Sequence, residues 1–270
     1  MADKSEFDPQ LIISHKFPEF TYSYTERDAA LYALGVGACA DDAVNDKELK
    51  YVYHHDGQQS ILVLPTFSAL FSLHFSSQLA QLPGFQYDPN LLLHGQQYVE
   101  IYKPLPSSGC ILNKATVAGL HDKVKAAVLE IEIVSYEKDT GEMLCMNRMT
   151  VFLRGAGGFS KSSQPYSYTR YLANQTLDYK IPKTQPFSVY EQCTQPSQVL
   201  RAIIKCVCNG EPNMIKSISG RFLLHVYPGE TLITEMWLEG SRVLYQVKVK
   251  ERNRAVLSGY VKLDHPISSL

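Results

Sequence analysis

The sequence has few features of a charged, oxidised or membrane-embedded protein. Its formal net charge is −1 over 270 residues and it has no run of five or six like charges, so nothing supports binding to nucleic acid. No apolar stretch approaches the length needed to cross a bilayer. The six cysteines form no C-x-x-C pair and no secretory segment opens the chain, which indicates reduced thiols inside a cell. We expect small molecules or other proteins as partners, and neither nucleic acid nor membrane.

The signatures of several enzyme classes are missing too. The eight histidines show no H-x-x-x-H or H-E-x-x-H spacing, which argues against a metalloenzyme. No G-x-S-x-G occurs and no cysteine is marked as a nucleophile, so a serine or cysteine hydrolase has little support. The glycine-rich stretch 155–163 meets neither nucleotide-binding fingerprint, because Ser160 stands where both need glycine. Cys206 and Cys208 have no second ligand pair, so we interpret them as thiols of a helix core.

Two sets of apolar, β-branched segments separated by turn residues predict two sheets. A hydrophobic content of 45% is enough for one large or two small domains. Each half contains four segments with strand composition. In the first half these are 97–103, 111–119, 126–136 and 143–153, and in the second half 214–224, 230–239, 241–251 and 254–263. We expect a first repeat over 1–160, a linker over 161–190 and a second repeat over 191–270.

Two helices are predicted between these strands. Thr25 followed by Glu26-Arg27-Asp28 gives a capping-box start to a helix that continues to Gly35. In the second half, residues 197–208 have helical composition, and Asn209-Gly210 ends that helix after barely three turns. This is a short helix for an element that must cover one face of a sheet.

Several motifs, in one order along almost the whole chain, resemble the peroxisomal 2-enoyl-CoA hydratase 2 family. They are also similar to the hydratase domain of the peroxisomal multifunctional enzyme type 2. The motifs are Tyr32-Ala33-Leu34-Gly35-Val36-Gly37, Leu64-Pro65-Thr66-Phe67, Leu91 to Pro106 with His94-Gly95 inside it, Val151 to Phe159, Gly220-Arg221-Phe222, Val226 to Leu232 and Thr234 to Gly240.

The resemblance implies an α+β fold known as a double hot-dog, in which two tandem curved antiparallel sheets occur and the second wraps around a long central helix. It implies acyl-CoA as the ligand and substrate, with no cofactor. It matches His94, Gly95, Lys123 and Phe222 to substrate-binding positions. These residue types suit that role, because lysine supplies a charge for a CoA phosphate, glycine lets backbone approach the pantetheine arm, and an aromatic ring gives an apolar wall.

The catalytic part of the family pattern is absent. Neither Gly-Asp nor Asn-Pro occurs, although the family signature Gly-Asp-x-Asn-Pro-x-His belongs just after Ser197-Gln198. The resemblance implies that a few dozen residues are skipped there, by splicing or by a gene-model artefact. We therefore assign no catalytic residue and expect an inactive or strongly impaired hydratase with a truncated central helix. The alternatives are a non-catalytic acyl-CoA-binding or hydratase-pairing module, a non-functional splice product, and a thioesterase using another acid such as Asp56.

The last three residues, Ser268, Ser269 and Leu270, differ from the Ser-Lys-Leu peroxisomal address only in the middle position. Such an address is read by a receptor. Together with the resemblance, this predicts a peroxisomal protein that is a partner of the import receptor. We also expect a homodimer.

Overall fold

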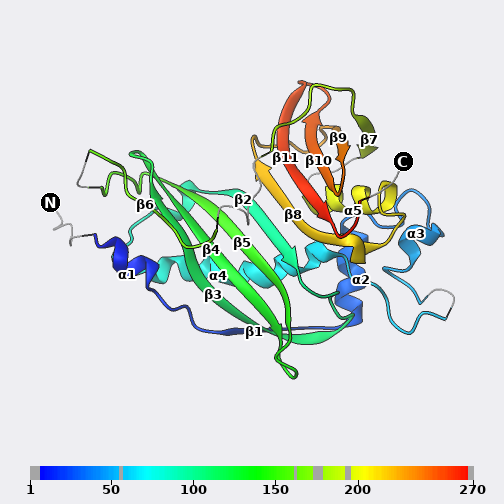
Figure 1. Ribbon diagram of the computed structural model, residues 1–270, viewed down its shortest axis with the longest axis horizontal. Coiled ribbons are helices and arrows are strands. Elements are labelled where there is room, and N and C mark those ends of the chain that lie inside the picture. The colour runs from blue at the N-terminus through cyan, green and yellow to red at the C-terminus, as the bar shows by residue number, and fades with distance from the viewer. Residues whose placement is uncertain (1–6, 55–56, 161–162, 173–178, 192–195, 267–270) are drawn as a thin grey trace.

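The computed structural model describes residues 7–54, 57–160, 163–172, 179–191 and 196–266 (Figure 1). Two groups of antiparallel strands lie side by side, and the helices lie mainly on one side of them. No described helix is both long and apolar enough to cross a membrane.

The first half forms a five-stranded antiparallel sheet with the order β1-β3-β4-β5-β2. Its strands are β1 (Phe20–Tyr24), β2 (Leu92–Ile101), β3 (Gly109–Asp122), β4 (Ala126–Glu137) and β5 (Met143–Arg154). The short strand β6 (Ser167–Thr169) adds to β3. The helices are α1 (Pro9–Ile13), α2 (Glu26–Gly35), α3 (Asp46–Leu49), the 3₁₀ helix η1 (Pro65–Ser72) and α4 (Leu73–Gln78). The capping box is present, since the Asp28 carboxylate accepts the Thr25 backbone N–H at 2.8 Å.

The second half repeats this topology. Its strands are β7 (Phe187–Glu191), β8 (Ile215–Phe222), β9 (Leu232–Glu239), β10 (Arg242–Val249) and β11 (Arg254–Leu263), in the order β7-β9-β10-β11-β8. Each strand corresponds to one in the first half, because β7 matches β1 and β8 matches β2 in both chain order and sheet position. The expected tandem antiparallel sheets are confirmed.

The two sheets join edge to edge into one eleven-stranded sheet. The seam is the antiparallel pair β2–β8, in which Gln96 lies opposite Arg221 and Glu100 opposite Ser217. The seam thus links the two matching edge strands of the repeats. Residues on either side of it can build one site from both halves.

The helix of the second half, α5 (Pro196–Cys206), has 11 residues and is therefore about 16 Å long. Val199, Leu200, Ala202 and Ile203 are at most 1% exposed and pack against β8 to β11. The same core also contains Ala33, Val36, Tyr51, Leu64 and Val99 from the first half. The short helix therefore shares its core with the other repeat.

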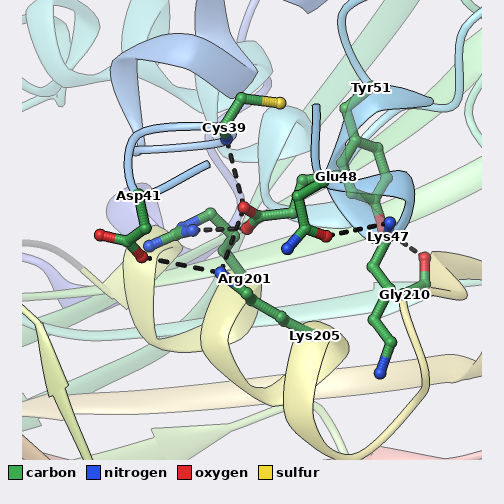
Figure 2. A network of polar contacts seen from close by, with 9 residues as sticks. Cys39, Asp41, Lys47, Glu48, Tyr51, Arg201, Lys205 and Gly210 are labelled. Atoms are coloured by element: carbon green, nitrogen blue, oxygen red, sulfur yellow. Dashed lines mark hydrogen bonds and ion pairs between the residues drawn. The ribbon is translucent and has the colours of Figure 1, made fainter. Parts of the chain in front are cut away.

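A buried ion pair fixes α5 to the loop region around α3 (Figure 2). Glu48 is 1% exposed, and its Oε1 accepts from Arg201 Nη1 at 2.5 Å. Its Oε2 accepts from Lys205 Nζ at 3.3 Å and from the Cys39 backbone N–H at 3.2 Å. One carboxylate thus connects two cations of α5 to the first repeat.

Candidate functional site

A cavity of about 610 Å³ lies between the helices and the central strands of the sheet, and we call it the inner cavity. Strands β2, β5 and β8 form its floor, so both repeats contribute to it. Tyr32 of α2, residues of η1 and α4, and Ser197 of α5 enclose it. Most of its wall is apolar, as in most pockets that bind small molecules.

A β-bulge at Gly95 determines which way His94 points. Gln97 and Val99 face the inner cavity, so regular alternation would turn His94 to the opposite side of the sheet. Instead, His94 pairs with Val151 and Gln96 with Thr150, which leaves Gly95 as an extra residue. The bulge brings His94 into the cavity wall. A Cβ on Gly95 would lie 3.0 Å from the Phe152 ring, so a larger residue would crowd the bulge.

Two of the sequence-predicted binding residues, His94 and Phe222, lie together at the inner cavity. Their ring centroids are 4.9 Å apart with planes tilted by 45°. The His94 Nε2 atom lies 3.2 Å from the Gln96 carbonyl oxygen. His94 is exposed at its surface, but the protein on its other sides desolvates the imidazole and holds its pKa below the usual value despite hydrogen bonds with Gln96 and Gln97. His94 is therefore neutral near pH 7.

A chain of amides continues from His94 into the protein. Gln97 Nε2 donates to Asn147 Oδ1 at 3.0 Å, and Asn147 Nδ2 donates to the Ser68 carbonyl at 3.0 Å. Asn147 is fully buried, so this chain fixes Gln97 against the cavity. On the other wall, burial raises the pKa of Tyr32, and the nearby side chains of Thr66 and Ser197 oppose this shift. The polar groups of the cavity are therefore neutral.

The lining of the inner cavity contains one imidazole and, among the described residues, no Asp or Glu. A site that takes a proton from water and gives a proton to a carbon atom needs both a base and an acid within reach of the ligand. Here His94 is the single titratable candidate apart from the tyrosine. The inner cavity thus offers a largely apolar volume, and its described lining contains no imidazole–carboxylate pair.

Lys123 lies apart from the other predicted binding residues. It is exposed in the β3–β4 turn. Three residue pairs lead across the sheet from the start of β2 to this turn. They are Leu92–Leu153 between β2 and β5, Leu153–Ala127 between β5 and β4, and Ala127–Asp122 between β4 and β3. Lys123 is thus about three strand spacings, roughly 14 Å, across the sheet from the start of β2.

The turn that carries Lys123 is held by its neighbour Asp122. The Asp122 carboxylate accepts the backbone N–H groups of Val124 and Gly158 at 2.8 Å and of Ser160 at 2.7 Å, together with the Ser160 hydroxyl at 2.6 Å. Burial would raise the pKa of Asp122, but these donors outweigh it and lower the pKa to about 2. The lysine is therefore presented from a rigid turn.

Other residues considered from the sequence lie elsewhere. Asp56, Ser268, Ser269 and Leu270 fall outside the described residues. Cys208 is buried, but Cys206 is exposed, so the interpretation of both as core thiols was wrong for Cys206. Within the described ranges no group of His, Cys, Asp and Glu could hold a metal ion.

Sequence reasoning missed Gln97, Asn147, Tyr32 and Ser197 as members of the site. Gln97 belongs to the same sequence motif as His94, but the bulge between them decides whether both side chains face the cavity. The bulge follows from the register between β2 and β5, so the sequence of β2 alone does not predict it. Asn147 lies inside a strand that the sequence predicts. A polar amide within that strand was the signal that could have identified it.

Comparisons with known proteins give a consistent assignment. Residues 22–155 match the model of the MFE-2 hydratase 2 N-terminal domain. The chain is 55% identical to Arabidopsis thaliana peroxisomal enoyl-CoA hydratase 2, over 98% of each chain, and 33% identical to Mus musculus peroxisomal multifunctional enzyme type 2, over 93% of this chain and 38% of that one. A MaoC-like dehydratase from Phytophthora capsici has a similar crystal structure, with a TM-score of 0.76, 25% identity and coverage of 97% of this chain and 100% of that one.

The alignment with the Arabidopsis protein also shows a difference in length. It extends over 304 positions, which is 34 more than the 270 residues present here. At least 34 positions of the alignment therefore have no residue of this chain.

Proposed function

Because the chain belongs to the peroxisomal enoyl-CoA hydratase 2 family, we propose that it binds the acyl part of a CoA thioester in the inner cavity but does not hydrate it. Members of this family are hydro-lyases of peroxisomal fatty-acid β-oxidation. They add water to a trans-2-enoyl-CoA and form a (3R)-3-hydroxyacyl-CoA, a reaction that needs no redox cofactor.

The observation that carries the proposal is the lining of the inner cavity. An apolar volume of about 610 Å³ suits an acyl chain, and His94 and Phe222 stand at its wall. Hydration also needs a base for the water, an acid for C2 and donors for the thioester oxygen. The residues that the structure describes in this lining supply no carboxylate. A missing general acid or base typically costs about 10²–10⁴-fold in rate, so loss of the pair leaves little turnover.

The length difference supports the same conclusion. The family signature would follow Ser197-Gln198, and the helix that begins at Pro196 is short. The missing alignment positions number at least 34, enough to include both the signature and the first turns of a longer helix. We infer that they fall at the start of α5.

The ligand is proposed to extend from the inner cavity toward Lys123. Gly95 forms the bulge that brings His94 into the cavity wall, and the pantetheine arm is proposed to pass along this wall. Lys123 projects from the fixed turn roughly 14 Å away, where its ammonium can meet a CoA phosphate.

Activity and binding are tested separately on the purified chain. Hydration of crotonyl-CoA is followed by loss of the enoyl absorbance, and we expect no rate above the enzyme-free blank, with the Arabidopsis protein as the positive control.

Calorimetry with decanoyl-CoA is expected to show binding that weakens in Phe222→Ala and Lys123→Ala. Turnover above the blank would refute the inactive state, and absence of heat at millimolar ligand would refute acyl-CoA binding.

Two partners are proposed besides the ligand. The Ser268-Ser269-Leu270 end is proposed to be read by the peroxisomal import receptor, and a fusion lacking Leu270 should remain outside peroxisomes. A homodimer is proposed as the assembly, and sedimentation equilibrium of the full chain tests it.

A further inference from the structure

The inner cavity opens to the surface at the end of the sheet where β2 begins and where β5 and β8 end. Among the residues that line it, Leu73, His94 and Phe222 are exposed, and Leu73 is exposed by 62%. Val99 and Ile218, which lie further from this end on β2 and β8, are at most 4% exposed. The exposed residues therefore mark the mouth of the inner cavity.

Exposed apolar side chains surround this mouth. Leu93 on β2 lies opposite Phe152 on β5, and both are exposed. Leu223 and Leu224 directly follow β8 and are exposed as well. We call this surface the mouth rim, and its members are Leu73, Leu93, Phe152, Phe222, Leu223 and Leu224. Apolar surface that is gathered in one place usually marks contact with another molecule, whereas single exposed leucines do not.

The same end of the sheet carries a cationic turn. Lys123, Val124 and Lys125 are exposed between β3 and β4. The Gly155 backbone N–H donates to the Lys125 carbonyl at 2.9 Å, which places the exposed Arg154 beside them. We call Lys123, Val124, Lys125 and Arg154 the basic turn. None of its three cations forms an ion pair with a residue that the structure describes.

The apolar residue at the tip of the basic turn is held in an unfavourable conformation. Val124 has a φ of 65°, which β-branched residues rarely adopt. Its backbone N–H donates to the Asp122 carboxylate at 2.8 Å, and this bond fixes the turn. Because Val124 is 66% exposed, packing within the protein does not account for a valine there. Backbone strain of this kind is typical of positions where a function uses the side chain.

We propose that this end of the sheet docks on an anionic lipid bilayer. The mouth rim and Val124 enter the headgroup region, and Lys125 and Arg154 lie against acidic headgroups. Apolar side chains next to cations are the chemistry of a surface that binds at a bilayer interface. A bilayer offers both layers over a wide area, which fits a rim and a turn that are roughly 14 Å apart across the sheet. The net charge of −1 does not predict this surface, because it carries no information about where the charges lie.

Docking in this orientation places the mouth of the inner cavity against the acyl region of the bilayer. An acyl chain then enters the cavity without crossing water, which avoids the cost of exposing apolar surface. This route rests on the proposed function, whereas the docking itself does not. Vesicles that contain no CoA ester therefore test the docking separately from acyl-CoA binding.

The test is flotation of the full chain with vesicles of phosphatidylcholine alone or of phosphatidylcholine mixed with phosphatidylserine. We expect the mixed vesicles to be bound roughly tenfold or more tightly, since each cation near an anionic surface strengthens binding about fivefold. Raising the salt from about 0.05 M to about 0.5 M should weaken this binding. Absence of binding to the mixed vesicles overturns the proposal, and equal binding to both kinds of vesicle overturns the role of the cations.

Variants of the basic turn separate docking from folding. Asparagine tolerates a positive φ, so Val124→Asn should keep or raise the free energy of unfolding in urea while weakening vesicle binding roughly threefold or more. Lys125→Gln should weaken binding about fivefold. Lys138→Gln is its matched control, because Lys138 is exposed in the β4–β5 hairpin at the opposite end of the sheet. Equal effects of Lys125→Gln and Lys138→Gln, or unchanged binding of Val124→Asn, overturn the docking of this turn.

Variants of the mouth rim test the apolar contact. The double variant Leu93→Ser with Leu223→Ser should weaken vesicle binding roughly tenfold or more. The control is Leu31→Ser with Leu34→Ser, two exposed leucines of α2, which follows β1 at the opposite end of the sheet. The near-UV circular dichroism of Trp237 reports whether each variant is folded. Equal losses in the two double variants overturn the proposal. It is also overturned if the rim variant alters the sedimentation of the lipid-free protein and leaves vesicle binding unchanged, because the rim is then a contact with a second copy.

Discussion

Glu48 illustrates how much a single buried charge contributes to this protein. It holds Arg201, itself 4% exposed, and Lys205, so removing its charge leaves a guanidinium in the core (Figure 2). We expect Glu48→Gln to lower the free energy of unfolding by about 3–5 kcal/mol. Asp41→Asn is the control, because Asp41 is 75% exposed and lies 3.6 Å from the same lysine. It should change stability by less than about 1 kcal/mol in urea unfolding. Equal effects of the two variants would show that burial of the pair is unimportant.

Asp122 gives a prediction about pH. Its pKa in the folded protein, about 2, lies below that of an unfolded aspartate. A lowered folded pKa adds stability that is fully present above the unfolded pKa of about 4 and disappears as the pH falls toward 2. We expect Asp122→Asn to lower stability by about 2 kcal/mol at pH 7. The gap to wild type should narrow in urea unfolding between about pH 4 and pH 3. If the difference in unfolding free energy between wild type and Asp122→Asn stays constant over that range, the loss of stability does not come from the charge of Asp122.

At the scale of elements, α5 should contribute to stability through one face. Ile203 is fully buried in the shared core, so Ile203→Ala should cost about 2–5 kcal/mol in urea unfolding. Gln198 is on the same helix and only partly buried, and Gln198→Ala should cost no more than about 1.5 kcal/mol, the usual contribution of one hydrogen bond. A cost for Ile203→Ala as small as for Gln198→Ala would mean that the short helix is loosely packed.

The elements also show what the sequence could predict. The eight strands expected from apolar, β-branched composition are confirmed, as are α2 and α5, because their patterns are local. β1 (Phe20–Tyr24) was missed although its aromatic residues alternate with Thr21 and Ser23, because it is only five residues long and lies at the edge of the sheet. β7 was missed within the expected linker because it is a short edge strand. The inward position of His94 was not predictable either, since it follows from the register between β2 and β5.

The whole molecule combines the two repeats into one unit. The β2–β8 seam supplies backbone hydrogen bonds, Glu48 supplies an ion pair, and six buried residues of the first repeat complete the core around α5. Each of these links involves both halves. The resemblance predicted the repeats, but these links depend on distant residues and were not visible in the sequence.

The links predict that the two halves unfold together. Trp237 on β9 is the sole tryptophan and is 8% exposed, so its fluorescence reports the second repeat, whereas far-UV circular dichroism reports the strands of both. In urea, the two signals should change with one midpoint, as in a two-state transition. Glu48→Gln should shift both midpoints equally, although Glu48 is in the first repeat and Trp237 in the second. Separate midpoints, with fluorescence changing first, would show that the second repeat unfolds on its own and that the seam does not couple the halves.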